Sequence, residues 1–245
     1  MDMKRSKGIS MALQAIIIIL TLITGCASMS SDEKIKRSTA HYQLGISYLN
    51  DNNVQPAYVE LQKALDLNPH DKEVLNALGV IHLLKFEDYP KAVEYFKRAL
   101  NEDKNFSEAS NNLGFAYERE ERFQEAIESY KDALSNPFYK NAQKAFNNLG
   151  RAYYRIRKYD EAADAYKESI RRSSDFPLPY YGLALSYNAL GRYDDAAAAL
   201  KMAIGLDPDY KGDTEKFRKE IRERRLFAKG NEERDIDDLI EILNY

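Results

Sequence analysis

One segment of 34 residues, from Pro177 to Tyr210, carries the pattern that the rest of the chain repeats. In its first half, apolar residues recur at intervals of three and four, which is the spacing of one helix face: Tyr180, Leu183, Ala184 and Tyr187. Gly191 then indicates a turn, and a second helix face ends before Pro208. The segment predicts a helical hairpin, which needs neighbours because a single hairpin cannot bury its own apolar face.

The same pattern recurs upstream, where it can be aligned on four Leu-Gly pairs: Leu44-Gly45, Leu78-Gly79, Leu113-Gly114 and Leu149-Gly150. The aligned units start at residues 38, 72, 107, 143 and 177, so successive starts are 34, 35, 36 and 34 residues apart. This spacing resembles the tetratricopeptide repeat (TPR), whose period is 34 residues. We therefore expect an all-α fold, a right-handed superhelix of five TPR hairpins over residues 38–71, 72–106, 107–142, 143–176 and 177–210.

Residues 211–245 no longer follow the repeat and are predicted to form a capping helix and a tail. The segment from Thr214 to Ala228 is charged and amphipathic, with Phe217, Ile221, Arg225 and Leu226 placed near one side. Such a helix would cover the apolar face that the last hairpin leaves exposed. A further short helix is predicted from Asp235 to Leu243.

The N-terminus has a basic start, an apolar run and an exit of small residues, which together are typical of a secretory signal peptide, here residues 1–25. The ending Leu22-Ile23-Thr24-Gly25-Cys26 resembles the bacterial lipoprotein box. That resemblance implies lipid attachment to Cys26, cleavage before it, and a lipidated tether over residues 26–37. The residue after the cysteine is Ala27 rather than aspartate, which by the same resemblance favours the outer membrane, facing the periplasm. The alternative is an uncleaved membrane anchor.

Several classes of function find no support in the sequence. A formal net charge of -3 gives no basic face for nucleic acid, and the single cysteine excludes a thiolate metal cluster. His41, His70 and His82 have no close ligand pair beside them, and no catalytic motif is present. We therefore expect no enzyme activity, no cofactor, no metal and no small-molecule substrate. A catalytic alternative would require a cluster of titratable groups in the groove.

In a TPR stack the concave surface is formed mainly by positions 2, 5, 9, 12 and 13 of each first helix. At these positions the N-terminal half of the chain is apolar and the fourth unit is basic and aromatic. The predicted partner-binding groove comprises Tyr42, Ile46, Leu49, Asn76, Val80, Leu84, Asn111, Phe115, Asn147, Arg151, Tyr154 and Arg155. The asparagines at position 5 could bond to the backbone of an extended partner segment.

Two alternatives remain open for these groove positions. Val80 and Leu83 could pack between the hairpins instead of facing a partner. A solvated charged face is the alternative for four basic residues: Arg151, Arg155, Arg157 and Lys158. One partner class is excluded: the chaperone-binding carboxylate clamp needs lysine and asparagine where this chain has Tyr42 and Ile46.

A lipoprotein box followed by a polar tether and five TPR units resembles the type IV pilus biogenesis/stability lipoproteins, or pilotins, best over residues 40–155. The resemblance implies a non-catalytic protein that binds outer-membrane secretin subunits and promotes their assembly. It also implies that the early repeats carry the partner surface, at Tyr42, Ile46, Leu49, Val80 and Leu84. The basic segment from Arg218 to Arg225 has no counterpart in it. The alternative is a periplasmic TPR scaffold that recruits cell-wall hydrolases or proteases.

Overall fold

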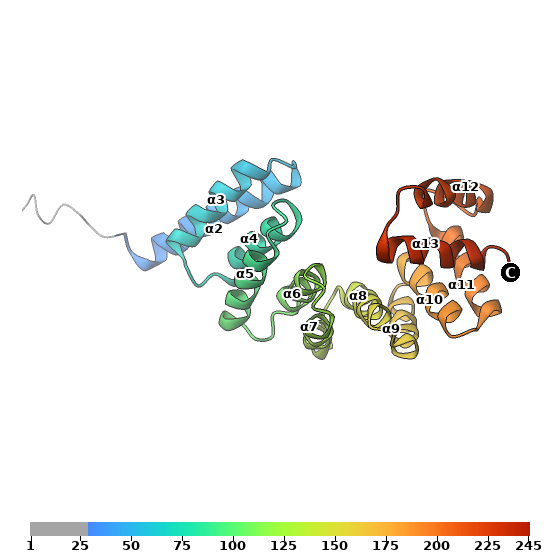
Figure 1. Ribbon diagram of the computed structural model, residues 1–245. Coiled ribbons are helices and arrows are strands. Elements are labelled where there is room, and N and C mark those ends of the chain that lie inside the picture. Colours follow the sequence, from blue (N-terminus) through green and yellow to red (C-terminus); the bar gives the residue numbers. More distant parts are fainter. Residues whose placement is uncertain (1–28) are drawn as a thin grey trace, which may run out of the picture.

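The computed structural model describes residues 29–245, in which every regular element is an α-helix, so the all-α fold class is confirmed. The predicted signal peptide and Cys26 lie outside the described residues. The helices follow one another along a curved array (Figure 1): α2 Ser31–Asn50, α3 Val54–Leu67, α4 Lys72–Leu84, α5 Tyr89–Glu102, α6 Ser107–Arg119, α7 Phe123–Ser135, α8 Ala142–Arg155, α9 Tyr159–Arg172, α10 Leu178–Ala189, α11 Tyr193–Leu206, α12 Thr214–Arg225 and α13 Gly230–Ile242.

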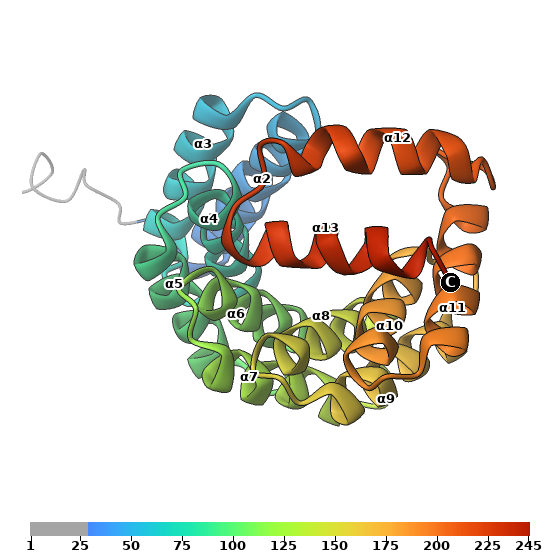
Figure 2. The same cartoon turned by 45° about the vertical axis from the view of Figure 1, so that its right-hand side comes forward.

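Helices α2 to α11 pair in sequence into five hairpins, and each hairpin stacks on the next. Figure 2 shows the first helices of the hairpins, among them α6, α8 and α10, on the inner side of the arc, and the second helices on its outer side. This arrangement is an α-solenoid, in which each hairpin buries its apolar face against its neighbours.

The turn inside each hairpin uses the same left-handed backbone conformation at the equivalent residue. The five residues are Asn52, Glu87, Glu121, Arg157 and Gly191, with φ angles of 57°, 53°, 58°, 62° and 72°. Only the fifth turn has the glycine that adopts this conformation without steric cost. The packing of the two helices therefore imposes the turn even where the residue disfavours it.

The Leu-Gly pairs explain how the two helices of a hairpin approach so closely. A Cβ atom on Gly79 would lie 2.5 Å from the ring of Phe96, and one on Gly150 would lie 2.8 Å from the ring of Tyr166. The glycine thus makes room for an aromatic ring of the second helix in three of the four pairs, and for Leu61 in the first. The fifth unit has Ala184 at this place and the smaller Leu200 in its second helix, and both are buried.

The first helix begins earlier than the repeat pattern predicts. Helix α2 starts at Ser31, so residues 31–37, assigned to the tether, are helical. Ser30 caps the helix by accepting a hydrogen bond from the Glu33 amide at 3.2 Å, and Arg37 pairs with Glu33 one turn later at 2.6 Å. A capped first turn with acidic residues favours a helix here.

Helices α12 and α13 pack on the last hairpin. Phe217 and Ile221 of α12, and Ile236 and Ile242 of α13, join its core. Leu226 does not, because it is 77% exposed, so its placement beside Phe217 was wrong. Leu226 follows Phe217 by nine positions, which is about two and a half helical turns, so it lies on the opposite side of the helix. Helix α13 also begins before the predicted Asp235, at Gly230.

Candidate partner-binding groove

The N-terminal half of the concave face presents apolar side chains from α2 and α4. The apolar core formed mainly by α3, α4 and α5 partly buries three of these side chains, Tyr42, Ile46 and Leu49. Val80 is also partly buried. Leu84, at the end of α4, is 54% exposed. This group of five residues, the open apolar patch, brings together the residues that the resemblance assigns to a partner surface.

The sequence left open whether Val80 and Leu83 pack between the hairpins, and the structure gives a different answer for each. Leu83 is only 4% exposed and belongs to the hairpin core, whereas Val80 keeps part of its side chain at the surface. Both residues pack against the core that the second hairpin shares with α6 and α7, but Leu83 lies deeper in it than Val80.

The asparagines at position 5 serve the array itself. The Asn112 amide donates to the side-chain oxygen of Asn76 at 3.0 Å, and the Asn148 amide donates to that of Asn111 at 3.2 Å. Asn111 and Asn147 are also nearly buried. The side-chain oxygens of Asn76 and Asn111 therefore already accept hydrogen bonds from the neighbouring first helix. This corrects the expectation that they are available to an extended partner segment. We call this pair of contacts the amide ladder.

Arg151 likewise has an internal partner. Its guanidinium donates to Glu118 of the preceding repeat, with an Nη2 to Oε2 distance of 3.0 Å, and lies 5.5 Å from the centre of the Phe115 ring. Glu118 also accepts a hydrogen bond from the Tyr130 hydroxyl at 2.9 Å. Burial, and then the charge of Glu118, raise the pKa of Tyr130. The cluster is a structural ion pair between repeats, in which Glu118 engages Arg151 while 34% of the Arg151 side chain stays exposed.

The C-terminal half of the concave face is covered by the chain's own helix α13. Figure 2 shows α13 running along the inner side of the arc beside α10. Arg155 of α8 donates two hydrogen bonds to Asp235 at 2.8 and 2.5 Å, and the Tyr154 hydroxyl donates to Asp238 at 3.2 Å. The Arg155 and Asp235 side chains are 19% and 18% exposed. Two predicted groove residues therefore bind an acidic helix, but that helix belongs to this chain.

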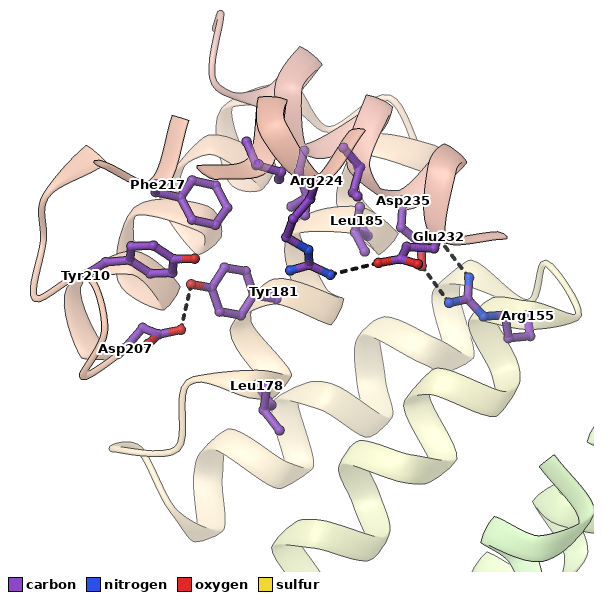
Figure 3. Close-up of a pocket in the computed structure, with 13 residues that line it drawn as sticks. Arg155, Leu178, Tyr181, Leu185, Asp207, Tyr210, Phe217, Arg224, Glu232 and Asp235 are labelled. Atoms are coloured by element: carbon purple, nitrogen blue, oxygen red, sulfur yellow. Dashed lines mark hydrogen bonds and ion pairs between the residues drawn. The ribbon is translucent and has the colours of Figure 1, made fainter. Parts of the chain in front are cut away.

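A cleft of about 400 Å³ remains between α13, α12 and the last hairpin (Figure 3). Its walls are mainly apolar, and the polar groups at its edge are paired. Tyr181 donates to Asp207 at 3.0 Å, and Arg224 donates to Glu232 at 2.9 Å. Burial raises the pKa of Tyr181, and the hydrogen bond to Asp207 raises it further. A tyrosine with a raised pKa stays protonated at neutral pH, so this arrangement suits binding better than proton transfer.

A buried histidine lies behind the open apolar patch. The His82 ring is surrounded by Tyr58, Phe86 and Tyr95, with ring centres 5.8, 5.3 and 5.3 Å away. Neither ring nitrogen has a hydrogen-bond partner among the described residues, although Nδ1 is 3.5 Å from Asp88. Burial lowers the pKa of His82. Its surroundings are those of a neutral core residue.

The described part of the chain contains no group of three or more metal-ligating residues close enough to hold an ion. Within the same residues, none of the helices combines the length and the apolar character needed to cross a bilayer. The concave face presents an open apolar patch at one end and a half-groove filled by α13 at the other.

The sequence interpretation did not predict that α13 occupies the C-terminal half of the groove. A signal was present, because Asp235 and Asp238 are three residues apart on one helix face and are followed by apolar residues. Their partners lie 80 and 84 residues earlier in the chain, however, and no local pattern relates the two.

Comparisons with known proteins agree with this architecture. A family model described as tetratricopeptide repeat matches residues 42–105 and 147–211, and a second model with the same description matches residues 106–175. Together these matches cover most of the chain.

Among characterised relatives, the type IV pilus assembly protein PilF of Pseudomonas aeruginosa is 29% identical over 136 residues, which are 51% of this chain and 54% of PilF. The chain thus spans about half the length of PilF. An uncharacterized protein of Haemophilus influenzae is 29% identical over 138 residues, 54% of this chain and 74% of that protein.

Solved structures show the same fold. The structure of Pseudomonas aeruginosa PilF superposes with a TM-score of 0.63 at 23% identity, covering 83% of this chain and 98% of that one. A structure of MamA gives a TM-score of 0.59 at 24% identity, covering 66% and 94%. At this level of identity the structural likeness concerns the fold alone. The repeat matches and the stacked hairpins together establish that the chain belongs to the tetratricopeptide repeat family.

Proposed function

We propose that this protein is a non-catalytic outer-membrane lipoprotein that binds secretin subunits through the open apolar patch and promotes their assembly in type IV pilus biogenesis. The observation that carries the proposal is the partly exposed apolar patch on α2 and α4. Exposed apolar groups gathered on one face usually mark a protein-interaction site. The similarity to a type IV pilus assembly protein supports the choice of partner.

The division of the groove supports the same assignment. Arg151, Tyr154 and Arg155 are bonded to groups of the chain itself, so they have less capacity for a partner in this conformation. Among residues 29–245, the open apolar patch has no comparable set of internal polar contacts. A partner segment that contributes apolar side chains would bury this surface, which is the main favourable term in association.

The test is capture of partners from an outer-membrane extract with the full lipidated protein, followed by mass spectrometry. Ile46→Asp and Val80→Asp should each reduce secretin recovery by about tenfold or more, because a desolvated carboxylate would replace an apolar contact. Val59→Asp is the matched control, since Val59 is an exposed apolar residue of α3 outside the predicted groove. Helix content measured by circular dichroism should stay unchanged in all three variants.

Three results would contradict the proposal. Equal secretin recovery with Ile46→Asp and Val59→Asp would remove the patch as the binding surface. Recovery of cell-wall hydrolases or proteases, with secretin multimers intact in a deletion strain, would favour the scaffold alternative. A Cys26→Ser variant that still fractionates with the outer membrane would contradict the lipid anchor.

A further inference from the structure

The basic segment from Arg218 to Arg225, which the pilotin resemblance leaves unexplained, divides into two groups in the structure. The first group holds α13 in place. Arg224 pairs with Glu232 at 2.9 Å, Arg225 pairs with Glu233 at 2.9 Å and also with Asp237, and Arg218 donates to the Leu243 carbonyl at 3.1 Å. These three arginines have an internal structural role.

The second group points away from α13. Lys219 and Arg222 are exposed and form no ion pair or side-chain hydrogen bond with any other described residue. They lie three residues apart and share one face of α12 with Leu226, with which they line a shallow open depression. Glu215 and Glu223 border the same depression, and Glu215 lies 3.5 Å from Arg218.

Two large apolar side chains follow directly where α12 ends. Leu226 is 77% exposed and Phe227 is 83% exposed, and the exposed Lys229 comes two residues later. The turn that carries them joins α12 to α13 at the end of α12 remote from α11 (Figure 2). We call Lys219, Arg222, Leu226, Phe227 and Lys229 the C-terminal tip.

We propose that the C-terminal tip docks on a membrane surface that contains anionic lipid. Exposed apolar side chains beside lysine and arginine are the combination that inserts at a headgroup boundary, because the apolar groups enter the acyl region while the cations bind lipid phosphates. The cations of the tip are unpaired in the described structure, and long flexible side chains adapt to laterally mobile headgroups. The depression beside them is open to solvent.

This docking would give the protein a second membrane contact, carried by the helices that follow the last hairpin, in addition to the lipid anchor proposed at Cys26. It does not depend on which protein occupies the open apolar patch. Since the tip lies on α12 and the following turn, and the patch lies on α2 and α4, the two surfaces can be altered separately.

The chain contains no tryptophan, so one tryptophan introduced at the C-terminal tip reports on the environment of the tip through its fluorescence. Phe227→Trp in the full chain would be reconstituted in vesicles of phosphatidylcholine alone and in vesicles that also contain phosphatidylglycerol. With phosphatidylglycerol present, the tryptophan emission should shift to the blue and should be quenched by brominated lipid. Added salt at about 0.5 M should reverse both effects, because it screens the headgroup attraction.

Phe138→Trp is the matched control, because Phe138 is 86% exposed but lies in the turn between α7 and α8. Its emission should be the same in both kinds of vesicle. Lys219→Gln combined with Arg222→Gln, in the Phe227→Trp background, should abolish the response while leaving helix content unchanged. The proposal is overturned if Phe227→Trp is insensitive to phosphatidylglycerol, if Phe138→Trp responds equally, or if the response survives loss of both cations. Secretin capture is read out separately, so its failure would leave this result standing.

Discussion

In the N-terminal half of the concave face, apolar side chains of α2 and α4 remain partly exposed. In the C-terminal half, the equivalent helices α8 and α10 lie beside α13. The hairpins on both sides share the same turn conformation and, in four of the five units, the same glycine contact. What differs is the chemistry of the exposed positions. Ile46 and Val80 offer only apolar surface, while Tyr154 and Arg155 offer hydrogen-bond donors that an acidic helix satisfies. One scaffold thus yields an open surface and a filled one.

The largest effect should come from opening the filled half. Asp235→Arg places two cations opposite each other in a largely buried site and should weaken α13 docking by about 2 to 3 kcal/mol. Hydrogen exchange should then show α13 losing protection about 30- to 150-fold, with α4 unchanged. Combining Asp235→Arg with Arg155→Asp should restore part of the protection. Unchanged exchange in α13 would mean that its apolar contacts alone hold it.

A second pair of variants tests whether the two halves share the same hairpin core. Gly79→Ala and Gly150→Ala each introduce a methyl group against a buried aromatic ring, so each should destabilise its hairpin by about 1 to 3 kcal/mol. Denaturant unfolding followed by circular dichroism measures the loss. Similar losses would place the difference between the halves on the concave surface, while a tolerated substitution in only one half would place it in the core.

Acidification should affect the N-terminal half through His82. Burial lowers the pKa of this histidine, and Asp88, Lys91 and Glu94 are the charged groups nearby. Because the folded pKa lies below the ordinary value of 6.5, the stabilising contribution is present above that value and is lost as the pH falls from it toward the folded pKa. The loss is at most about 1.4 kcal/mol per pH unit. Hydrogen exchange of α4 should become faster in acid, and His82→Phe should remove the dependence.

The smallest predicted effect is on the docking of α13 in the filled half. Its pH dependence is opposite to that of His82, because docking weakens as the pH rises. Burial raises the pKa of Asp238, so docking of α13 is favoured below the ordinary carboxyl pKa and weakens as the pH rises through the raised value. Asp238→Asn keeps an acceptor for the Tyr154 hydroxyl and should strengthen docking at pH 7 by less than about 1 kcal/mol, since solvent screens this partly exposed group. A slower exchange of α13 amides would show it, and faster exchange would contradict it.

The sequence predicted the repeated hairpins because their packing is local. Gly79 and Phe96 lie in one repeat, and a fixed period relates them to Gly150 and Tyr166. The start of α2 was not predicted, because the repeat alignment begins at residue 38 while the helix is set by the cap at Ser30. The repeat pattern did not predict the contacts between elements that are far apart in the sequence. Arg155 and Asp235 are 80 residues apart, and their meeting depends on the curvature of the array and on the turn after α12.

The amide ladder has a mechanical consequence. It ties the inner edges of α4, α6 and α8 together, with two side-chain hydrogen bonds of about 1 kcal/mol each resisting separation. At the two end junctions the donor position holds Ala77 and Gly182, which have no side-chain amide to offer. The first junction is therefore the more compliant one, because at the last junction α13 binds both α8 and the fifth hairpin. Under a load between a membrane attachment and a bound partner, the first hairpin should tilt before the other four come apart.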